Sequence, residues 1–244
     1  FHPARARSAL FPENLFSLLW KAQGCPEVFT IFDIGCNEGD LTLLLLRLAR
    51  EQLPDDASIE VVGVDIDSNL IERANKKSVD LLSSMENVKA EFVAADFMLD
   101  NSESLGRFSG KMHFVSLFSV TMWVHLNHGD VGLRSFFDRA CDLLTATGVL
   151  VVEPQSRKSY KNARKRALKL QLPEPKHWGS IALKNPEQDI DDICKERDFA
   201  SILYLGKEMW ERSLSIYSNV SLPSLKSPME SKKRSGDADE GGDK

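Results

Sequence analysis

The chain has 244 residues, which suits one α/β domain with a well-developed core, and its 42% hydrophobic and 27% charged residues are typical of a globular protein. No apolar run is long enough to cross a membrane, no signal peptide is apparent, and a net charge of −5 gives by itself no indication of nucleic-acid binding. The four cysteines have neither metal-binding nor disulfide spacing, so we expect a reducing compartment and a cytoplasmic protein.

Short apolar segments alternate with helical patterns along most of the chain. Five segments predict strands: 27–34, 59–66, 90–96, 113–120 and 149–154. Three amphipathic patterns predict the helices between them: 40–50, 68–85 and 131–148. Because the strands are apolar on both faces and helices separate most of them, we expect a mostly parallel sheet covered on both sides.

The pattern changes after residue 155. A basic helix follows first, then a helix over 186–197, and then two strands at 199–206 and 211–219 that predict a closing antiparallel hairpin. From residue 222 the chain is polar, with five acids and five bases, and we expect a disordered tail. The expected organisation is one domain over 1–221 and a tail over 222–244.

The turn after the first strand, in "TIFDIGCNEGDLTLLL", is the first candidate binding element. Gly35 and Gly39 would let the backbone turn sharply and approach a ligand closely, although a tight turn that only packs a helix on its strand is the alternative. The dinucleotide fingerprint G-x-G-x-x-G does not fit this loop. A ligand at the carboxyl end of the strands would agree with the general behaviour of doubly wound sheets.

Acidic residues follow the next two strands. Asp65 ends the second strand in "VVGVDID", where a carboxylate could accept hydrogen bonds from both ribose hydroxyls of a nucleoside. Asp96 and Phe97 end the third strand, as an acceptor for an adenine amino group beside an aromatic face. Each alone could be a solvated strand-end residue. Together with the D-x-G-x-x-x-G loop they resemble the class I S-adenosylmethionine-dependent methyltransferases, which are Rossmann-like α/β proteins.

The fourth strand leads into "SVTMWVHLNHGD", a polar and donor-rich stretch that should face the methyl group of such a cofactor. His125 and His128 are either substrate contacts or structural histidines that cap a loop. Seven bases and no acid lie between Arg157 and Lys169. A run of this kind is usually a solvated helix face, but its place after the fifth strand favours an anionic, phosphate-bearing partner.

Several motifs resemble one family in particular. "FDIGCNEGDLT", "VDID", "TMWVHLNHGDVGL", "LVVEPQ" with Tyr160, and "WERSLSIY" are similar to the bicoid-interacting family of RNA 5′-phosphate methyltransferases, and the similarity runs from near Phe1 to about Tyr217. The "HLNHGD" form resembles the branch that methylates the 5′-monophosphate of small RNAs, including a histidine transfer RNA and microRNA precursors. Ser156 and Arg157 stand where the family usually has Pro-Trp.

This resemblance implies a methyl transfer from S-adenosylmethionine to an RNA 5′-monophosphate, with S-adenosylhomocysteine as the product. The cofactor-binding candidates are Asp33, Gly35, Cys36, Asn37, Gly39, Asp65, Ile66, Asp96, Phe97 and Ser119. The candidates for orienting the phosphate or offsetting its charge are His125, Asn127, His128, Lys158, Tyr160 and Arg164. We expect a monomer with a tRNA-like or microRNA-precursor-like partner, no metal and no membrane partner.

Three other functions stay open at this point. The chain could be a catalytically weak RNA-binding scaffold that keeps the fold, a γ-phosphate RNA capping methyltransferase, or a small-molecule O-methyltransferase. The intact first loop argues against the scaffold, and the basic helix argues against the small-molecule enzyme.

Overall fold

A computed structural model describes residues 7, 9–99, 103–207 and 212–220. The strands are β1 (Val28–Ile34), β2 (Ser58–Asp65), β3 (Val88–Ala94), β4 (Met112–Phe118), β5 (Leu144–Glu153), β6 (Ala200–Lys207) and β7 (Ser213–Ser218). The helices are α2 (Leu15–Ala22), α3 (Asp40–Gln52), α4 (Ser68–Leu82), α5 (Glu103–Gly106), α6 (Thr121–Asp142), α7 (Arg157–Lys169) and α8 (Pro186–Lys195). The predicted tail over 222–244 and the motif residues Trp210 and Glu211 lie outside the described residues.

The seven strands form one sheet in the order β3-β2-β1-β4-β5-β7-β6. Strands β1 to β5 are parallel to their neighbours, whereas β7 runs antiparallel to both β5 and β6. The predicted parallel sheet with a closing hairpin is therefore confirmed. The strand order reverses between β1 and β4, and this reversal is where an open α/β sheet leaves a crevice for a ligand.

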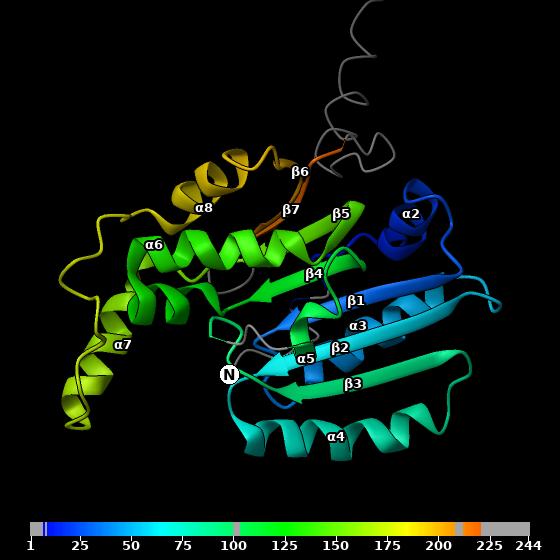
Figure 1. Cartoon of the computed structure of the whole chain (residues 1–244), viewed down its shortest axis with the longest axis horizontal. Helices are drawn as coiled ribbons and strands as arrows, with labels where there is room; N and C mark the ends of the chain where they lie inside the picture. The colour runs from blue at the N-terminus through cyan, green and yellow to red at the C-terminus, as the bar shows by residue number, and fades with distance from the viewer. Residues whose placement is uncertain (1–6, 8, 100–102, 208–211, 221–244) are drawn as a thin grey trace, which may run out of the picture.

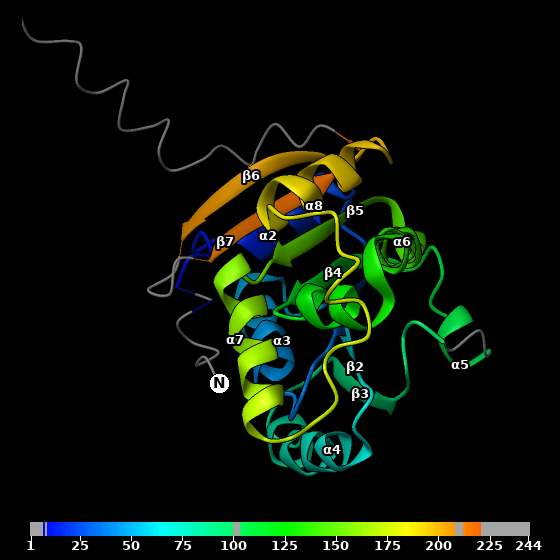
Figure 2. The ribbon, with the colours of Figure 1, turned by 90° about the vertical axis from the view of Figure 1, so that its left-hand side faces the viewer.

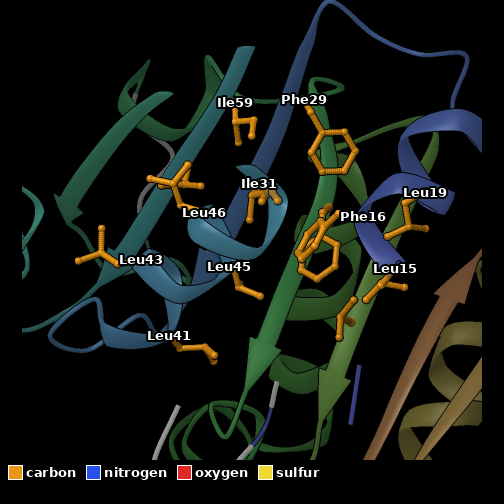
Figure 3. Close-up of a cluster of buried hydrophobic side chains, with 14 of the residues drawn as sticks. Leu15, Phe16, Leu19, Phe29, Ile31, Leu41, Leu43, Leu45, Leu46 and Ile59 are labelled. Atoms are coloured by element: carbon orange, nitrogen blue, oxygen red, sulfur yellow. The ribbon is translucent and has the colours of Figure 1, made fainter. Parts of the chain in front are cut away.

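Helices cover both faces of the sheet (Figure 1). Helices α2, α3 and α4 pack on one face, and α6 and α8 pack on the other with the short α5. Four leucines of α3 are almost fully buried: Leu41, Leu43, Leu45 and Leu46. Figure 3 shows them in one cluster with side chains of α2, β1 and β2. Burying side chains of this size contributes about 1.5–3 kcal/mol each, which explains the apolar run after the first loop.

One helix and two boundaries differ from the predictions. Helix α2 was not predicted, yet Leu15, Phe16 and Leu19 are fully buried, and the Phe16 ring lies 5.5 Å from that of Phe114. Helix α6 ends at Asp142 instead of Gly148, because Leu144 already pairs with Met112 of β4.

The third difference concerns the start of α6, which begins at Thr121, ten residues before the predicted 131. Gly129 interrupts the helical backbone with φ 68° and ψ −170°, so two helical segments meet there. A local pattern does not show that the first segment is helical, because its polar residues resemble a loop. The stretch predicted as a strand-end loop is thus a short helix that lies against the cavity described below.

None of the helices in the described part of the chain has both the length and the apolar content needed to cross a membrane. All four cysteines are free thiols, and burial raises the pKa of Cys141 to about 12. Among the described residues, no three His, Cys, Asp or Glu side chains gather in a way that could hold a metal ion.

Candidate active site

One large cavity lies at the carboxyl edge of the sheet, where the order of strands reverses. Its volume is about 1050 Å³, and it runs from the loop after β1 to helix α7. The arrows of β2, β3 and β4 point toward this edge in Figure 1, and Figure 2 looks onto it, with α7 and the chain that follows lying across the sheet end. A volume of this order holds a nucleoside-sized ligand together with part of a second molecule.

The loop after β1 forms the floor of the cavity. Asp33, Gly35, Cys36 and Asn37 line it, as predicted residues of the cofactor site should. Gly39 does not line it. This glycine has φ 77° and precedes α3, and a Cβ there would lie 2.8 Å from the ring of Phe92. Gly39 is therefore needed for a left-handed backbone and close packing, and the structure gives no sign that it approaches a ligand.

Asp33 is 2% exposed and is held from both sides by hydroxyl groups. Thr42 Oγ1 donates to Asp33 Oδ2 (2.6 Å), and Ser116 Oγ donates to Asp33 Oδ1 (2.7 Å). Burial raises the pKa of this carboxyl above its ordinary value, although the two hydroxyl hydrogen bonds and the charge of Arg7 act in the opposite direction. Asp33 thus connects β1, β4 and α3 beneath the cavity.

Asp65 and Asp96 lie at the ends of neighbouring strands, and both line the cavity. Asp65 accepts hydrogen bonds from the backbone N–H of Asn37 (2.9 Å) and of Asp67 (3.0 Å), one on each carboxylate oxygen. Each oxygen keeps a second lone pair, so the carboxylate can accept two further hydroxyl groups. This arrangement fits the two ribose hydroxyls of an adenosyl group.

Apolar surface adjoins these carboxylates. Ile66 is 71% exposed and lines the cavity, and Phe97 lies below Asp96 with 8% exposure and an edge contact to Phe136. Asp96 accepts the backbone N–H of Met98 (2.9 Å). The amino group of an adenine ring between Ile66 and Phe97 would lie within reach of the Asp96 carboxylate.

A charge cluster that no sequence motif indicated continues this wall, and its Arg7, Ser119 and Arg212 line the cavity. Glu153 is fully buried at the end of β5, and it pairs with Arg7 (2.7 Å) and Arg212 (2.9 Å). The hydroxyl of Ser119, a predicted cofactor residue with φ 58°, accepts a hydrogen bond from both guanidinium groups and donates to Glu153. Two guanidinium groups against one carboxylate leave an excess of positive charge, which could hold the α-carboxylate of the cofactor.

The first segment of α6 divides the predicted substrate residues into two groups. Trp123, Val124, Asn127 and His128 line the cavity, in agreement with the i, i+4 spacing of one helix face. His125 lies on another face and is 2% exposed. His125 Nε2 is hydrogen-bonded to Asp130 Oδ1 (2.6 Å), and its Nδ1 is hydrogen-bonded to the hydroxyl of Tyr160 (3.1 Å).

Tyr160 is 1% exposed and, like His125, does not line the cavity. Burial raises the pKa of its hydroxyl above the ordinary value, so the hydroxyl keeps its proton at neutral pH. The structure thus brings Asn127 and His128 to the cavity but places His125 and Tyr160 in a buried network behind it. Helical geometry separates His125 from Asn127 and His128 on α6, whereas Tyr160 belongs to α7 and lies on the side of that helix that faces His125.

The predicted cations on α7 also divide. Lys158 is exposed and does not line the cavity. Arg164 forms an ion pair with Glu174, and its guanidinium lies 5.2 Å from the ring of Trp178. Two other cations line the cavity: Arg166 of α7 and Lys176 of the chain between α7 and α8. Arg166 belongs to the basic run from which the sequence predicts a phosphate-bearing partner, but nothing in the sequence around Lys176 indicates that it lines the cavity.

Comparison with known proteins agrees with this geometry. A human protein named RNA 5′-monophosphate methyltransferase is 33% identical over 236 residues, which cover 89% of this chain and 76% of the human protein. This chain belongs to the same family. The family profile that matches residues 112–219 is described as Bicoid-interacting protein 3 (Bin3). A zebrafish (Danio rerio) member named pre-miRNA 5′-monophosphate methyltransferase is 29% identical over 232 residues, which cover 89% of this chain and 87% of that protein.

The fold of this Bin3 family member also occurs in solved methyltransferases. Magnesium protoporphyrin IX methyltransferase from Synechocystis PCC 6803, crystallised with S-adenosylhomocysteine, matches with a TM-score of 0.56 over 89% of this chain and 84% of that chain. Only 15% of the aligned residues are identical, so this likeness concerns the fold alone. The predicted family, the predicted S-adenosylmethionine-dependent methyltransferase fold and the cofactor class that goes with it are confirmed.

Proposed function

We propose that this chain transfers a methyl group from S-adenosylmethionine to the 5′-monophosphate of a small RNA. The observation that carries the proposal is that one cavity joins two different walls. One wall, with Asp65, Asp96 and the Arg7–Glu153–Arg212 cluster, fits an adenosyl group and an amino-acid carboxylate. The other, with Asn127, His128, Arg166 and Lys176, offers an amide, an imidazole and two cations to a phosphate.

The residues that would hold the cofactor are those of the first wall. Asp65 would accept the ribose hydroxyls, Ile66 and Phe97 would flank the adenine, and Arg7 and Arg212 would bind the carboxylate. When bound, S-adenosylmethionine supplies an electrophilic methyl group on a sulfonium. Ser119 and Gln155 keep the two arginines and the β5 end in place, since Gln155 donates to the backbone oxygen of Ser119.

The nucleophile would be an oxygen of the RNA phosphate. This oxygen is already anionic near neutral pH, because the second pKa of a phosphate monoester is about 6, so the chain needs no strong base. An oxygen–carbon bond forms while the sulfur–carbon bond breaks, and the phosphate loses one negative charge. The chain positions the oxygen in line with the methyl group, and small errors of position can reduce the rate about 100-fold.

Amide and imidazole side chains are suited to this task. Strong cationic contacts on the reacting oxygen would reduce its nucleophilicity, whereas amide and imidazole donors orient it at less cost. Asn127 and His128 stand on the cavity side of α6, and the 51% exposed ring of Trp123 beside them offers a surface on which the first base can stack. Asn127 Nδ2 also donates to the backbone oxygen of Trp123 (2.8 Å), which ties these two positions together.

The finer assignments are proposals of the same kind. Transfer RNA or microRNA precursors are the proposed substrates, a monomer is the proposed active form, and the four free thiols support the cytoplasm as the compartment. Arg157, which stands where the family usually has tryptophan, lies 5.3 Å from the ring of Tyr160 and 5.4 Å from that of Trp178. It therefore has a packing contact in this chain that can replace an aromatic one.

Three RNAs of one sequence, with a 5′-monophosphate, a 5′-hydroxyl or a 5′-triphosphate, test the proposal when incubated with radiolabelled S-adenosylmethionine. The expected result is labelling of the monophosphate RNA and little labelling of the others. Preference for the triphosphate would make the chain a γ-phosphate methyltransferase. Equal labelling of all three would place the methyl on a base or ribose and overturn the proposal.

A further inference from the structure

The segment of chain between α7 and α8, residues 174–182, is here called the strap. It crosses the sheet end next to the first segment of α6 (Figure 2). Two backbone N–H groups of the strap donate to the "HLNHGD" motif, and a hydrogen bond within the motif holds the accepting carboxylate of Asp130. The backbone N–H of His177 donates to the backbone oxygen of Leu126 (3.1 Å), the backbone N–H of Ala182 donates to Asp130 Oδ2 (2.9 Å), and Asp130 Oδ1 accepts from His125 (2.6 Å).

Charge and shape both favour this attachment. Burial alone would raise the pKa of Asp130, but hydrogen bonds from His125 and from the backbone of Ala182 and Leu183 lower it below its ordinary value. Asp130 is therefore ionised at neutral pH and holds the strap as a charged acceptor. Gly129 completes the contact, since a Cβ there would lie 2.9 Å from His177 Nδ1.

The other side of the strap is held by α7. Trp178 and Ile181 pack in a small apolar cluster with Met122, Leu126, Tyr160 and Ala163. The Trp178 ring lies near both Arg157 and Arg164 (5.4 and 5.2 Å), and Arg164 also pairs with Glu174 at the start of the strap. Contacts from two helices thus fix the backbone of the strap on both sides of Lys176.

The consequence is the placement of Lys176, which directly precedes His177 and lines the cavity. Arg166 lines the same cavity from α7. Neither cation forms an ion pair with any carboxylate of residues 7, 9–99, 103–207 or 212–220, whereas Arg164, on the same helix, does. Two cations without a carboxylate partner at a cavity wall form a site for an anionic group.

We infer that Lys176 and Arg166 bind phosphate groups at the 5′ end of the RNA, and that His125 and Asp130 are positioning residues that act by holding the strap. This inference rests on the proposed function and assigns the substrate-binding residues of the same site. It differs from the sequence-based expectation, in which His125 itself touches the phosphate. It also gives the buried part of the "HLNHGD" motif a physical task.

The first test is steady-state methylation of a 5′-monophosphorylated RNA by the full chain, with cofactor affinity measured separately by calorimetry. Lys176→Met is expected to raise the KM for RNA about 10-fold while kcat and cofactor affinity stay within about twofold, because a contact to a phosphate oxygen other than the reacting one stabilises the bound substrate and the transition state alike. Lys176→Arg should restore most of the affinity. Lys111→Met is the matched control and should behave as the wild type. Lys111 is exposed and directly precedes β4, so it lies at the amino ends of the parallel strands, away from the cavity.

The second test examines the positioning role through a double-mutant cycle. Asp130→Asn alone should also raise the KM for RNA about 10-fold, and the double variant with Lys176→Met should be no worse than either single variant, because both changes remove the same contact. Effects that multiply would show that Asp130 acts independently of Lys176 and would overturn the positioning role. Lys176 is exposed, so Lys176→Met keeps the inference testable even where Asp130→Asn fails to fold.

Failure of the inference and failure of the proposed function give different results. A wild-type KM for Lys176→Met, with active wild-type enzyme, overturns the inference and leaves the function in place. A wild-type chain that labels no RNA overturns the function. In that case equilibrium binding of the 5′-monophosphorylated RNA at several salt concentrations still decides the inference. Losing one phosphate contact should reduce the log–log salt slope by about 0.7, and an unchanged slope for Lys176→Met would refute it.

Discussion

Replacement of Asp65 by asparagine tests the cofactor wall most directly. Each carboxylate oxygen of Asp65 accepts one backbone N–H, from Asn37 or from Asp67, and each keeps a lone pair for a ribose hydroxyl. Asparagine preserves the shape and one acceptor oxygen but removes the charge, and its NH₂ group must face one of the two N–H donors. We therefore expect a loss of one charge-assisted hydrogen bond to the cofactor, about 1.5–3 kcal/mol.

That energy corresponds to a decrease of about 10- to 150-fold in affinity. Isothermal titration calorimetry with S-adenosylhomocysteine measures it, and circular dichroism shows whether the variant is folded. Asp67→Asn is the matched control. Asp67 is exposed and does not line the cavity, and its side chain accepts the backbone N–H of Asn69 at the start of α4 (2.9 Å).

Asparagine caps a helix as well as aspartate does, so Asp67→Asn should keep wild-type affinity. Unchanged affinity in Asp65→Asn would refute the assignment of Asp65 to the ribose. Equal losses in both variants would show that the effect comes from the loop after β2 as a whole and not from contact with the cofactor.

Three further predictions concern positions around the cavity. The raised pKa of Asp33 means that the folded state binds the carboxyl proton more tightly than the unfolded state, so the stability that Asp33 contributes is present below about pH 3.9 and is lost as pH rises through the folded pKa. The unfolding free energy of Asp33→Asn relative to wild type, measured in urea titrations, should therefore increase with pH. A difference that stays constant with pH would contradict the raised pKa. Gly39→Ala should lower the unfolding free energy by about 1–3 kcal/mol more than Gly110→Ala in the same titrations. Both glycines have positive φ (77° and 67°), but of the two only Gly39 has an aromatic ring against the added Cβ. Equal losses would exclude the packing role of Gly39. Tyr160→Phe should lower stability by about 1 kcal/mol through the lost hydroxyl contact with His125 and leave kcat at saturating RNA unchanged, and a large fall in kcat would show that the hydroxyl reaches the substrate.

Most of the fold could be predicted because its signals are local. A run of apolar residues such as 27–34 must be buried on both faces, and a loop with two glycines between such a run and a leucine-rich helix has few possible structures. The same locality explains the predicted cofactor residues. Asp65 and Asp96 directly follow strands, and parallel strands bring their carboxyl ends to one edge of the sheet. The sequence by itself therefore determined the sheet, its hairpin and the edge at which the cavity lies.

The tertiary structure alone decided which side chains reach the cavity. Arg7 and Glu153 are 146 positions apart, so no local pattern could indicate that they meet beside Ser119. His125 and His128 look equivalent in the sequence, but a helix that begins at Thr121 sends one into a buried network and the other to the cavity. Lys176 has no motif of its own, and it reaches the cavity because Asp130 of α6 and the α7 side chains around Trp178 hold the strap from two sides. Contacts between distant segments set these positions, and a single sequence records such contacts only through the fold that they stabilise.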